Sequence, residues 1–246
     1  MTDCIRITVI KTAGSAPRDA GTQMLVWADR TEGTIGGGAL EWDAIATARQ
    51  MISEGRATLT RRIPLGPALG QCCGGAVTLL WEMAETLQAP RRRPLWIYGA
   101  GHVGRAIVHV MKPLPDFALT WIDTSADRFP ETDVTTLVAQ DPAAVVKHAP
   151  DDAEHLVLTY SHDMDLAICH AILSRPFAQA GLIGSATKWA RFKTRLAALG
   201  HDPAQISRIA CPIGDPRLGK HPAALALGVA TAMISPANAR TKDRTA

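Results

Sequence analysis

The sequence has few cysteines, and their spacing is not that of a disulfide framework or a zinc site. Its five cysteines form an odd number, with no CxxC pair and no Cys/His cluster. Cys72 and Cys73 are adjacent, and consecutive Cα atoms lie about 3.8 Å apart, less than the roughly 4.4–6.8 Å that a disulfide usually spans. We therefore expect free thiols and a reducing, cytoplasmic location.

Long apolar runs and a strong excess of one charge are also absent. No stretch approaches the roughly 20 apolar residues of a membrane helix, and no export signal begins the sequence. The formal net charge of +3 is too small to indicate nucleic-acid binding, although basic residues concentrate at 91–93 and 188–195. We expect neither a membrane nor a nucleic-acid partner, and we expect Lys188 and its basic neighbours to form a solvated helix face.

The first third of the chain predicts a small domain with short strands and one helix. Residues 5–10 and 22–27 are extended runs, and the first alternates apolar and polar residues as a half-buried strand does. Apolar residues at helical spacing, with acids early in the segment, predict a helix over 39–53. A strand is predicted over 76–81, directly after the two adjacent cysteines, which we therefore expect on a surface turn.

In the rest of the chain, short apolar runs alternate with segments of helical periodicity. This alternation is typical of a parallel sheet covered by helices. The segment “QAPRRRP” has the prolines and arginines of a linker. We predict an α/β protein with a small N-terminal α/β domain over 1–90, a Rossmann-like domain with a mostly parallel sheet over 94–236, and a disordered tail over 237–246. Within the second domain we expect strands at 134–139, 155–160 and 180–184, and helices near 163–174 and 185–199.

Gly99, Gly101 and Gly104 form a GxGxxG pattern between a predicted strand and a helix that begins near His102. Asp123 lies 19 residues beyond Gly104, at the end of the next predicted strand, close to the spacing of an acid that binds a ribose. Glycines in such a loop let the backbone approach a pyrophosphate, which the amides at the helix N-terminus stabilise. A tight turn without a ligand is the alternative.

Two further strand-to-helix junctions have polar residues. “TYSHDMD” places Ser161, His162 and Asp163 at the carboxyl end of a predicted strand, where open α/β sheets bind ligands. His162 is a candidate base or ligand and Asp163 a candidate N-cap, with a plain helix start as the alternative. We expect Asp165 to be a first-turn acid. Ser185, after the next strand, is either an N-cap or a phosphate contact.

The N-terminal domain has two glycine-rich loops and the cysteine pair. “GSAPRDAG” and “GTIGGGALE” both offer backbone amides to an anion, and Arg18 can donate two hydrogen bonds to a phosphate. For glycines 36–38 a permissive turn before a helix is the alternative. Flanking glycines make burial of both Cys72 and Cys73 unfavourable, so we expect a functional thiol there, either as a ligand to a soft metal or as an acceptor of sulfur. A packed turn is the alternative.

Taken together, the motifs resemble the XdhC family, the xanthine dehydrogenase accessory proteins, which are related to the CoxI-type maturation proteins. The resemblance extends from about residue 5 to 234, and the joint order of the motifs is more specific than any one of them. The motifs are “GSAPRDAG”, “GTIGGGALEW”, “LGPALGQCCGG”, “IYGAGHVGRA”, “YSHDMDLAI”, “GLIGSATKWARFK” and “CPIG”.

The resemblance implies a cytoplasmic cofactor chaperone with no catalytic turnover of its own. It would bind the molybdenum cofactor, a molybdopterin with a phosphate tail, hold it while a cysteine desulfurase supplies the sulfido ligand, and deliver it to apo xanthine dehydrogenase. Cys72 and Cys73 would contact molybdenum or relay sulfur. The glycine loops and basic residues would hold the pterin and phosphate, so the implied cofactor-binding set is Gln71, Cys72, Cys73, Arg18, Gly36, Gly37, Gly38, Gly99, Gly101, His102, Gly104, Asp123, His162 and Ser185.

A second function stays open at this point. The GxGxxG site is also typical of a nicotinamide-dependent oxidoreductase or a nucleotide-modifying enzyme, with a nucleotide at that loop and His162 as the base. Neither tyrosine is followed four residues later by a lysine, so the short-chain dehydrogenase arrangement is absent. The fold alone does not decide between these functions. Homo-oligomerisation is also left open.

Overall fold

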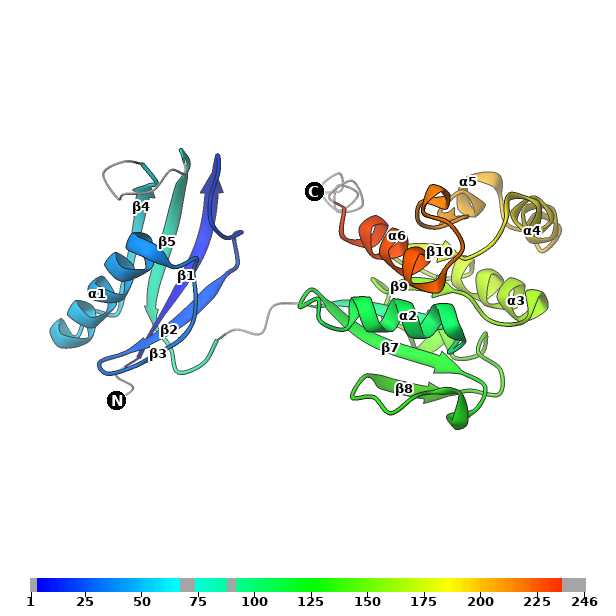
Figure 1. Ribbon diagram of the computed structural model, residues 1–246, viewed down its shortest axis with the longest axis horizontal. Helices are drawn as coiled ribbons and strands as arrows, with labels where there is room; N and C mark the ends of the chain where they lie inside the picture. Colours follow the sequence, from blue (N-terminus) through cyan, green and yellow to red (C-terminus); the bar gives the residue numbers. More distant parts are fainter. Residues whose placement is uncertain (1–3, 67–73, 88–91, 236–246) are drawn as a thin grey trace. The chain divides into compact units, whose positions relative to one another are not determined.

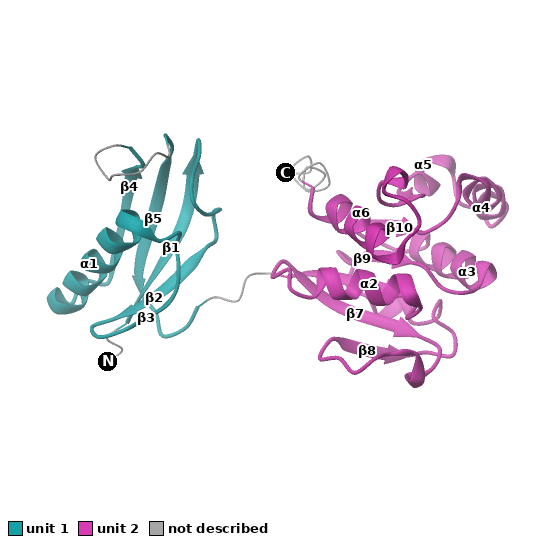
Figure 2. Ribbon diagram, in the orientation of Figure 1, with its two compact units in different colours: residues 1–90 teal, residues 91–246 magenta. Residues whose placement is uncertain are grey.

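The computed structural model describes residues 4–66, 74–87 and 92–235. The chain divides into two compact units, Met1–Pro90 and Arg91–Ala246 (Figure 2), and each is described by itself. None of the helices in the described ranges combines the length and the apolar character needed to cross a membrane.

The described part of the first unit is an antiparallel sheet with helix α1 packed against a face of it (Figure 1). The strand order is β3-β2-β1-β5-β4. The elements are β1 (Cys4–Ala13), β2 (Gln23–Trp27), β3 (Thr31–Gly33), α1 (Gly38–Glu54), β4 (Thr58–Pro64) and β5 (Ala76–Met83).

Alternation along β1 creates the core of this unit. Ile5, Ile7 and Val9 point to the helix side and are fully buried, as their spacing predicts. Trp81 packs among them, and its indole nitrogen donates to the carbonyl oxygen of Ala44 in α1 at 3.0 Å. Strands β3 and β4 were not predicted, because one is three exposed residues long and the other is largely polar.

The second unit has a six-stranded sheet in which every paired strand is parallel. The strand order is β11-β10-β9-β6-β7-β8. The elements are β6 (Arg93–Tyr98), α2 (His102–Met111), β7 (Phe117–Asp123), β8 (Thr135–Val138), β9 (Glu154–Val157), α3 (His162–Leu173), β10 (Gln179–Leu182), α4 (Ala186–Ala198), α5 (Pro203–Ile206), β11 (Ile209–Ala210) and α6 (Pro222–Ile234).

Helices cover both faces of this sheet (Figure 1). Apolar residues of α2 and α6 pack on one face, and those of α3 and α4 pack on the other. Numbered from β6, the strand order is 3-2-1-4-5-6, the order of a dinucleotide-binding fold, and the chain reverses direction along the sheet between β6 and β9. The predicted α/β class, with a Rossmann-like second domain, is confirmed. The loops after β6 and β9 therefore flank the position where such sheets bind ligands.

Candidate functional site

The three glycines of the loop after β6 have different physical roles. Gly99 has φ of +119°, and a Cβ there would lie 2.4 Å from the carbonyl oxygen of Leu158. A Cβ on Gly104 would lie 2.0 Å from the carbonyl oxygen of Gly99. Gly101, the N-cap of α2, has no atom within 4 Å of its Cβ position. Two glycines are thus required by packing within the protein, whereas the third borders open space at a helix N-terminus.

Asp123 fastens this loop to the end of β7. Its side chain is buried, and Oδ2 accepts from the amide of Ala100 at 2.5 Å. Oδ1 accepts from the amide of Thr124 at 2.7 Å and lies 2.7 Å from Nε of Arg128. The Arg128 guanidinium in turn covers the ring of Tyr160 at 4.8 Å. Both carboxylate oxygens already accept from protein groups, and the ribose contact stays a prediction.

The loop after β9 begins α3 with a capped turn. Ser161 is the N-cap and its hydroxyl accepts from the amide of Met164 at 3.4 Å. The prediction of Asp163 as the N-cap is wrong, because this residue lies in the first turn and pairs with Arg195 at 2.9 Å. His162 is exposed at the same edge of the sheet, so it is accessible to a ligand.

A buried ion pair links α3 to α4 beneath these loops. Lys188 Nζ lies 2.5 Å from Oδ2 of Asp165, whose side chain is fully buried, and also donates to the carbonyl oxygen of Ile183 at 3.2 Å. Asp165 Oδ1 accepts from the amide and the hydroxyl of Thr159 at 2.9 and 2.7 Å. The prediction that Lys188 lies on a solvated face is wrong, since only 11% of its side chain is exposed.

The sequence contains one signal for this pair. A helix dipole disfavours a cation in the first turn, yet Lys188 lies three residues after Ser185, the N-cap of α4. A lysine in that position indicates a specific acidic partner, but the sequence does not say which acid. The hydroxyl of Ser185 accepts from the amide of Lys188 at 3.2 Å, so the capping alternative is observed, and the phosphate contact stays a prediction.

Cys211 lies beside this pair. Its Sγ is 3.4 Å from the Cβ position of Gly184, which also lies 2.9 Å from Cδ of Lys188. Burial raises the pKa of the Cys211 thiol to about 11, although the positive charge of Lys188 acts in the opposite direction. The thiol is therefore protonated at neutral pH and is not an activated nucleophile.

Three segments of the first unit that are distant in sequence meet at one place. A Cβ on Gly75 would lie 2.2 Å from the carbonyl oxygen of Ser15, so the residues after the cysteine pair pack against the “GSAPRDAG” loop. The same loop packs on the triple glycine, because a Cβ on Gly36 would lie 2.8 Å from Pro17 and 3.5 Å from Cγ of Arg18. The exposed residue Arg18 thus lies beside Gly36, and Ser15, three residues earlier in the same loop, contacts Gly75.

The triple glycine itself binds an internal anion. Glycines 36–38 all have positive φ, with values of 126°, 73° and 63°. Oε2 of Glu41 accepts from the amides of Ile35 and Gly37 at 2.9 and 3.0 Å, and from the hydroxyl of Thr34. Burial alone would raise the pKa of Glu41, but these hydrogen bonds outweigh it and the pKa is lowered. An external phosphate at these amides would have to displace Glu41.

We predict that Glu41→Gln lowers the free energy of unfolding by about 1–3 kcal/mol at pH 7, because an amide cannot accept these three bonds as a carboxylate does. The folded-state pKa is lowered, so the contribution is present above the ordinary value of 4.5 and is lost as the pH falls through the folded value. The difference between wild type and variant should therefore shrink below that pH in urea unfolding curves. Glu54→Gln, at the exposed end of the same helix, is the control and should have little effect at any pH.

Gln71, Cys72 and Cys73 lie outside the described residues, so their roles stay predictions. Within the described ranges, no group of three or more His, Cys, Asp or Glu side chains is arranged to hold a metal ion. The predicted residues that are described form two groups, one in each unit. The carboxyl edge of the second unit has Gly99, Gly101, His102, Gly104, Asp123, His162 and Ser185, and the first unit has Arg18, Gly36, Gly37 and Gly38.

Comparisons with known proteins identify both parts of the chain. Residues 95–233 match the model of the XdhC Rossmann domain, and residues 2–63 match that of the XdhC and CoxI family. The protein YqeB of Escherichia coli (strain K12), described as uncharacterized, is 31% identical over 214 residues, which cover 84% of this chain but 38% of that protein. The chain therefore spans less than half the length of this relative.

One solved structure has the same fold along almost the entire chain. It is a crystal structure described as a xanthine dehydrogenase from Bacillus halodurans, with a TM-score of 0.76. The similarity covers 99% of this chain and 93% of that chain at 18% sequence identity. At this identity the likeness shows a shared fold and nothing about a shared activity.

Proposed function

The chain belongs to the XdhC and CoxI family, and on that premise we propose that it is an accessory protein for the maturation of xanthine dehydrogenase. Its cargo is the molybdenum cofactor, which it holds while a cysteine desulfurase supplies the sulfido ligand and then delivers to the apo-enzyme. In this function the protein binds and transfers its cargo and has no turnover of its own. Xanthine dehydrogenase and the desulfurase are its proposed partners.

The meeting of three loops in the first unit supports this proposal most directly. Gly75 packs on Ser15, and Arg18 lies against Gly36. In the sequence, the cysteine pair directly precedes Gly74 and Gly75. Thiolates are the ligands that soft metal centres prefer, and an exposed arginine binds phosphate through two parallel hydrogen bonds. We propose that Cys72 or Cys73 contacts molybdenum or relays sulfur, and that Arg18 contacts an anionic group of the cargo.

The open space at Gly101 supports an anion contact in the second unit. In a GxGxxG loop, a phosphate approaches the backbone at the second glycine. Here that glycine is Gly101, and packing within the protein does not require a glycine at this position. The amides at the N-terminus of α2 favour negative charge there. This geometry fits the phosphate tail of a molybdopterin, and it fits a nucleotide equally well.

A nicotinamide-dependent or nucleotide-modifying enzyme is the second candidate. The strand order of the second unit favours it, because the glycine loop lies at the point where dinucleotides bind in such sheets. Exposed His162 at the same edge is its candidate base. Two observations count against it: Asp123 is bound by protein groups, and the tyrosine–lysine arrangement of short-chain dehydrogenases is absent from the sequence.

Retention of the cofactor by the purified protein tests the proposal. Apo-protein would be mixed anaerobically with extracted molybdenum cofactor and separated by gel filtration, with molybdenum and oxidised pterin assayed in the protein fraction. We expect stoichiometric retention by wild type and loss of at least about tenfold in affinity, equivalent to roughly 1.4 kcal/mol, for Cys72→Ala or Cys73→Ala. Cys211→Ala, which removes a half-buried thiol of the other unit, is the control and should retain the cofactor.

Two results would contradict the proposal in different ways. If the Cys72→Ala, Cys73→Ala double variant retained and delivered the cofactor normally, the thiols would have no role in it. If wild type retained no cofactor but bound NAD, the enzyme alternative would replace the chaperone.

A further inference from the structure

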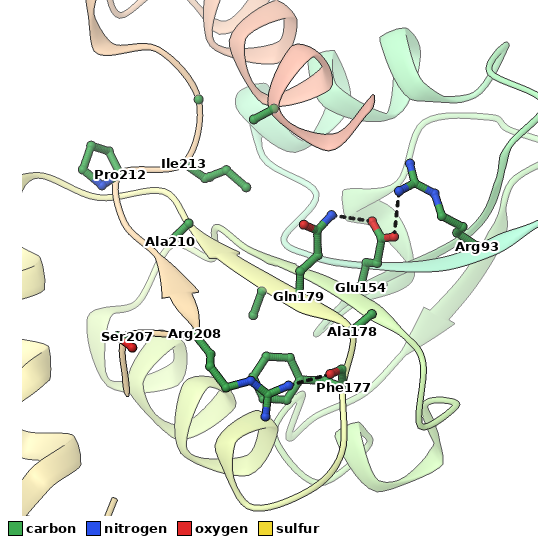
Figure 3. Close-up of a pocket in the computed structure, with 13 residues that line it drawn as sticks. Arg93, Glu154, Phe177, Ala178, Gln179, Ser207, Arg208, Ala210, Pro212 and Ile213 are labelled. Carbon is green, nitrogen blue, oxygen red and sulfur yellow. Dashed lines mark hydrogen bonds and ion pairs between the residues drawn. The ribbon is translucent and has the colours of Figure 1, made fainter. Parts of the chain in front are cut away.

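A cavity in the Rossmann-like unit lies at the opposite end of the strands from the glycine loop. It has a volume of about 770 Å³ and is bordered by the first residues of β6, β9 and β10 and by the segment around β11 (Figure 3). This volume is within the range of small-molecule sites. The cavity belongs entirely to the second unit, and none of the predicted cofactor-binding residues lines it, although Pro212, Ile213 and Gly214 of the “CPIG” motif do.

One wall of the cavity is formed by an ion pair and a glutamine, which together have no net charge. Gln179 donates to Oε2 of Glu154 at 2.7 Å, and Oε1 of Glu154 lies 3.1 Å from Nη1 of Arg93 (Figure 3). Arg93 is held further by a bond to the carbonyl oxygen of Met233 at 3.0 Å and by the ring of Phe117, 4.2 Å from its guanidinium carbon. These contacts satisfy the pair, which therefore contributes shape and polarity but no net charge.

The opposite wall of the cavity contains Arg208, whose N–H donors are only partly used by the protein. The Arg208 guanidinium lies over the ring of Phe177, with its carbon 3.8 Å from the ring centroid, and Nη2 donates to the carbonyl oxygen of Phe177 at 2.7 Å (Figure 3). Of the carboxylates that the structure describes, none pairs with it. An arginine held by one bond and one ring keeps most of its five N–H donors for a ligand.

The ring under Arg208 belongs to the core of the second unit. Phe177 is buried, and its ring and that of His155 meet edge to face, with 6.4 Å between the centroids. Burial lowers the pKa of His155 to about 3, so the histidine is neutral at physiological pH and adds no charge. The guanidinium is thus pre-oriented by packing, which lowers the entropy that binding would cost.

Apart from Ser207, the remaining lining is mainly apolar and includes Ala180, Ala210, Pro212 and Ile213. The charged side chains of the lining, Arg93, Glu154 and Arg208, leave one positive charge in excess. We propose that this cavity is a binding site for a small organic anion, an aromatic carboxylate or sulfonate, whose charged group pairs with Arg208 and whose ring packs on the apolar wall. This site is independent of the proposed cofactor-transfer function.

The test uses 2-naphthoate as the probe and the full-length protein, with amide ¹H–¹⁵N spectra recorded during a titration. We expect saturable shifts of the amides of residues 178–180, 208–211 and 213. Arg208→Gln should weaken binding by at least about tenfold, because a bidentate, charge-assisted contact is lost. Arg191→Gln, which removes the same charge from an exposed site on α4, should leave the affinity unchanged. The uncharged 2-naphthamide should bind at least about tenfold more weakly than the acid.

Three outcomes would overturn the site. Shifts confined to the glycine loop at 99–104 would place the anion at the carboxyl edge instead. Equal affinity of wild type and Arg208→Gln would remove the arginine from the site, and equal affinity for acid and amide would remove the requirement for an anion. No result of this titration bears on cofactor retention, so the two proposals can fail separately.

Discussion

The free energy of unfolding of the second unit is expected to fall by about 3–5 kcal/mol when Lys188 is replaced by methionine. The substitution keeps most of the apolar stem but leaves the fully buried carboxylate of Asp165 without its cation. The bonds from Thr159 remain, so the loss should be near the lower end of that range. Unfolding in urea, with hydrogen exchange followed on peptides of each unit, would locate the loss in the second unit.

Two variants give this experiment its controls. Lys193→Met changes an exposed lysine of the same helix and should alter stability by less than about 0.5 kcal/mol. Adding Asp165→Asn to Lys188→Met removes the orphaned charge and should recover part of the loss. A Lys188→Met variant as stable as Lys193→Met would show that the pair is not closed in solution.

Gly104→Ala is expected to destabilise the second unit by about 3 kcal/mol or more, at the upper end of the cost of overpacking. Its Cβ would lie 2.0 Å from the carbonyl oxygen of Gly99, a backbone atom that cannot rotate away. Alanine is otherwise a better helix former than glycine by about 1 kcal/mol. Any loss of stability in the variant therefore results from the close contact between α2 and the loop. Thermal unfolding at matched concentration measures it.

Gly101→Ala is the matched variant in the same loop. Nothing lies within 4 Å of its Cβ position and its φ of −74° suits alanine, so only the modest cost of an alanine N-cap is expected. A methyl group there would still obstruct an anion approaching the helix N-terminus. If Gly104→Ala were as stable as Gly101→Ala, the close packing of α2 on the loop would be incorrect.

Much of the architecture follows from local patterns in the sequence. The period-two alternation of β1 and the helical spacing in α1 identify their elements, because a buried face repeats at the period of its own backbone. The strand–glycine–helix order from β6 to α2 identifies the Rossmann-like unit. The short strands β3 and β11 have three and two residues, too few for any period to be recognised.

The site divides in the same way. The sequence by itself determined the α/β class, the family and the glycine loop, because each is recognised from short motifs and from their order along the chain. Only the tertiary structure decided that Glu41 fills the triple-glycine loop, that Asp123 fastens the loop after β6, and that Lys188 is buried against Asp165. Arg208 likewise reaches Phe177 across 31 positions. The role of a charged side chain depends on its partner in the folded protein. A local sequence pattern does not identify that partner.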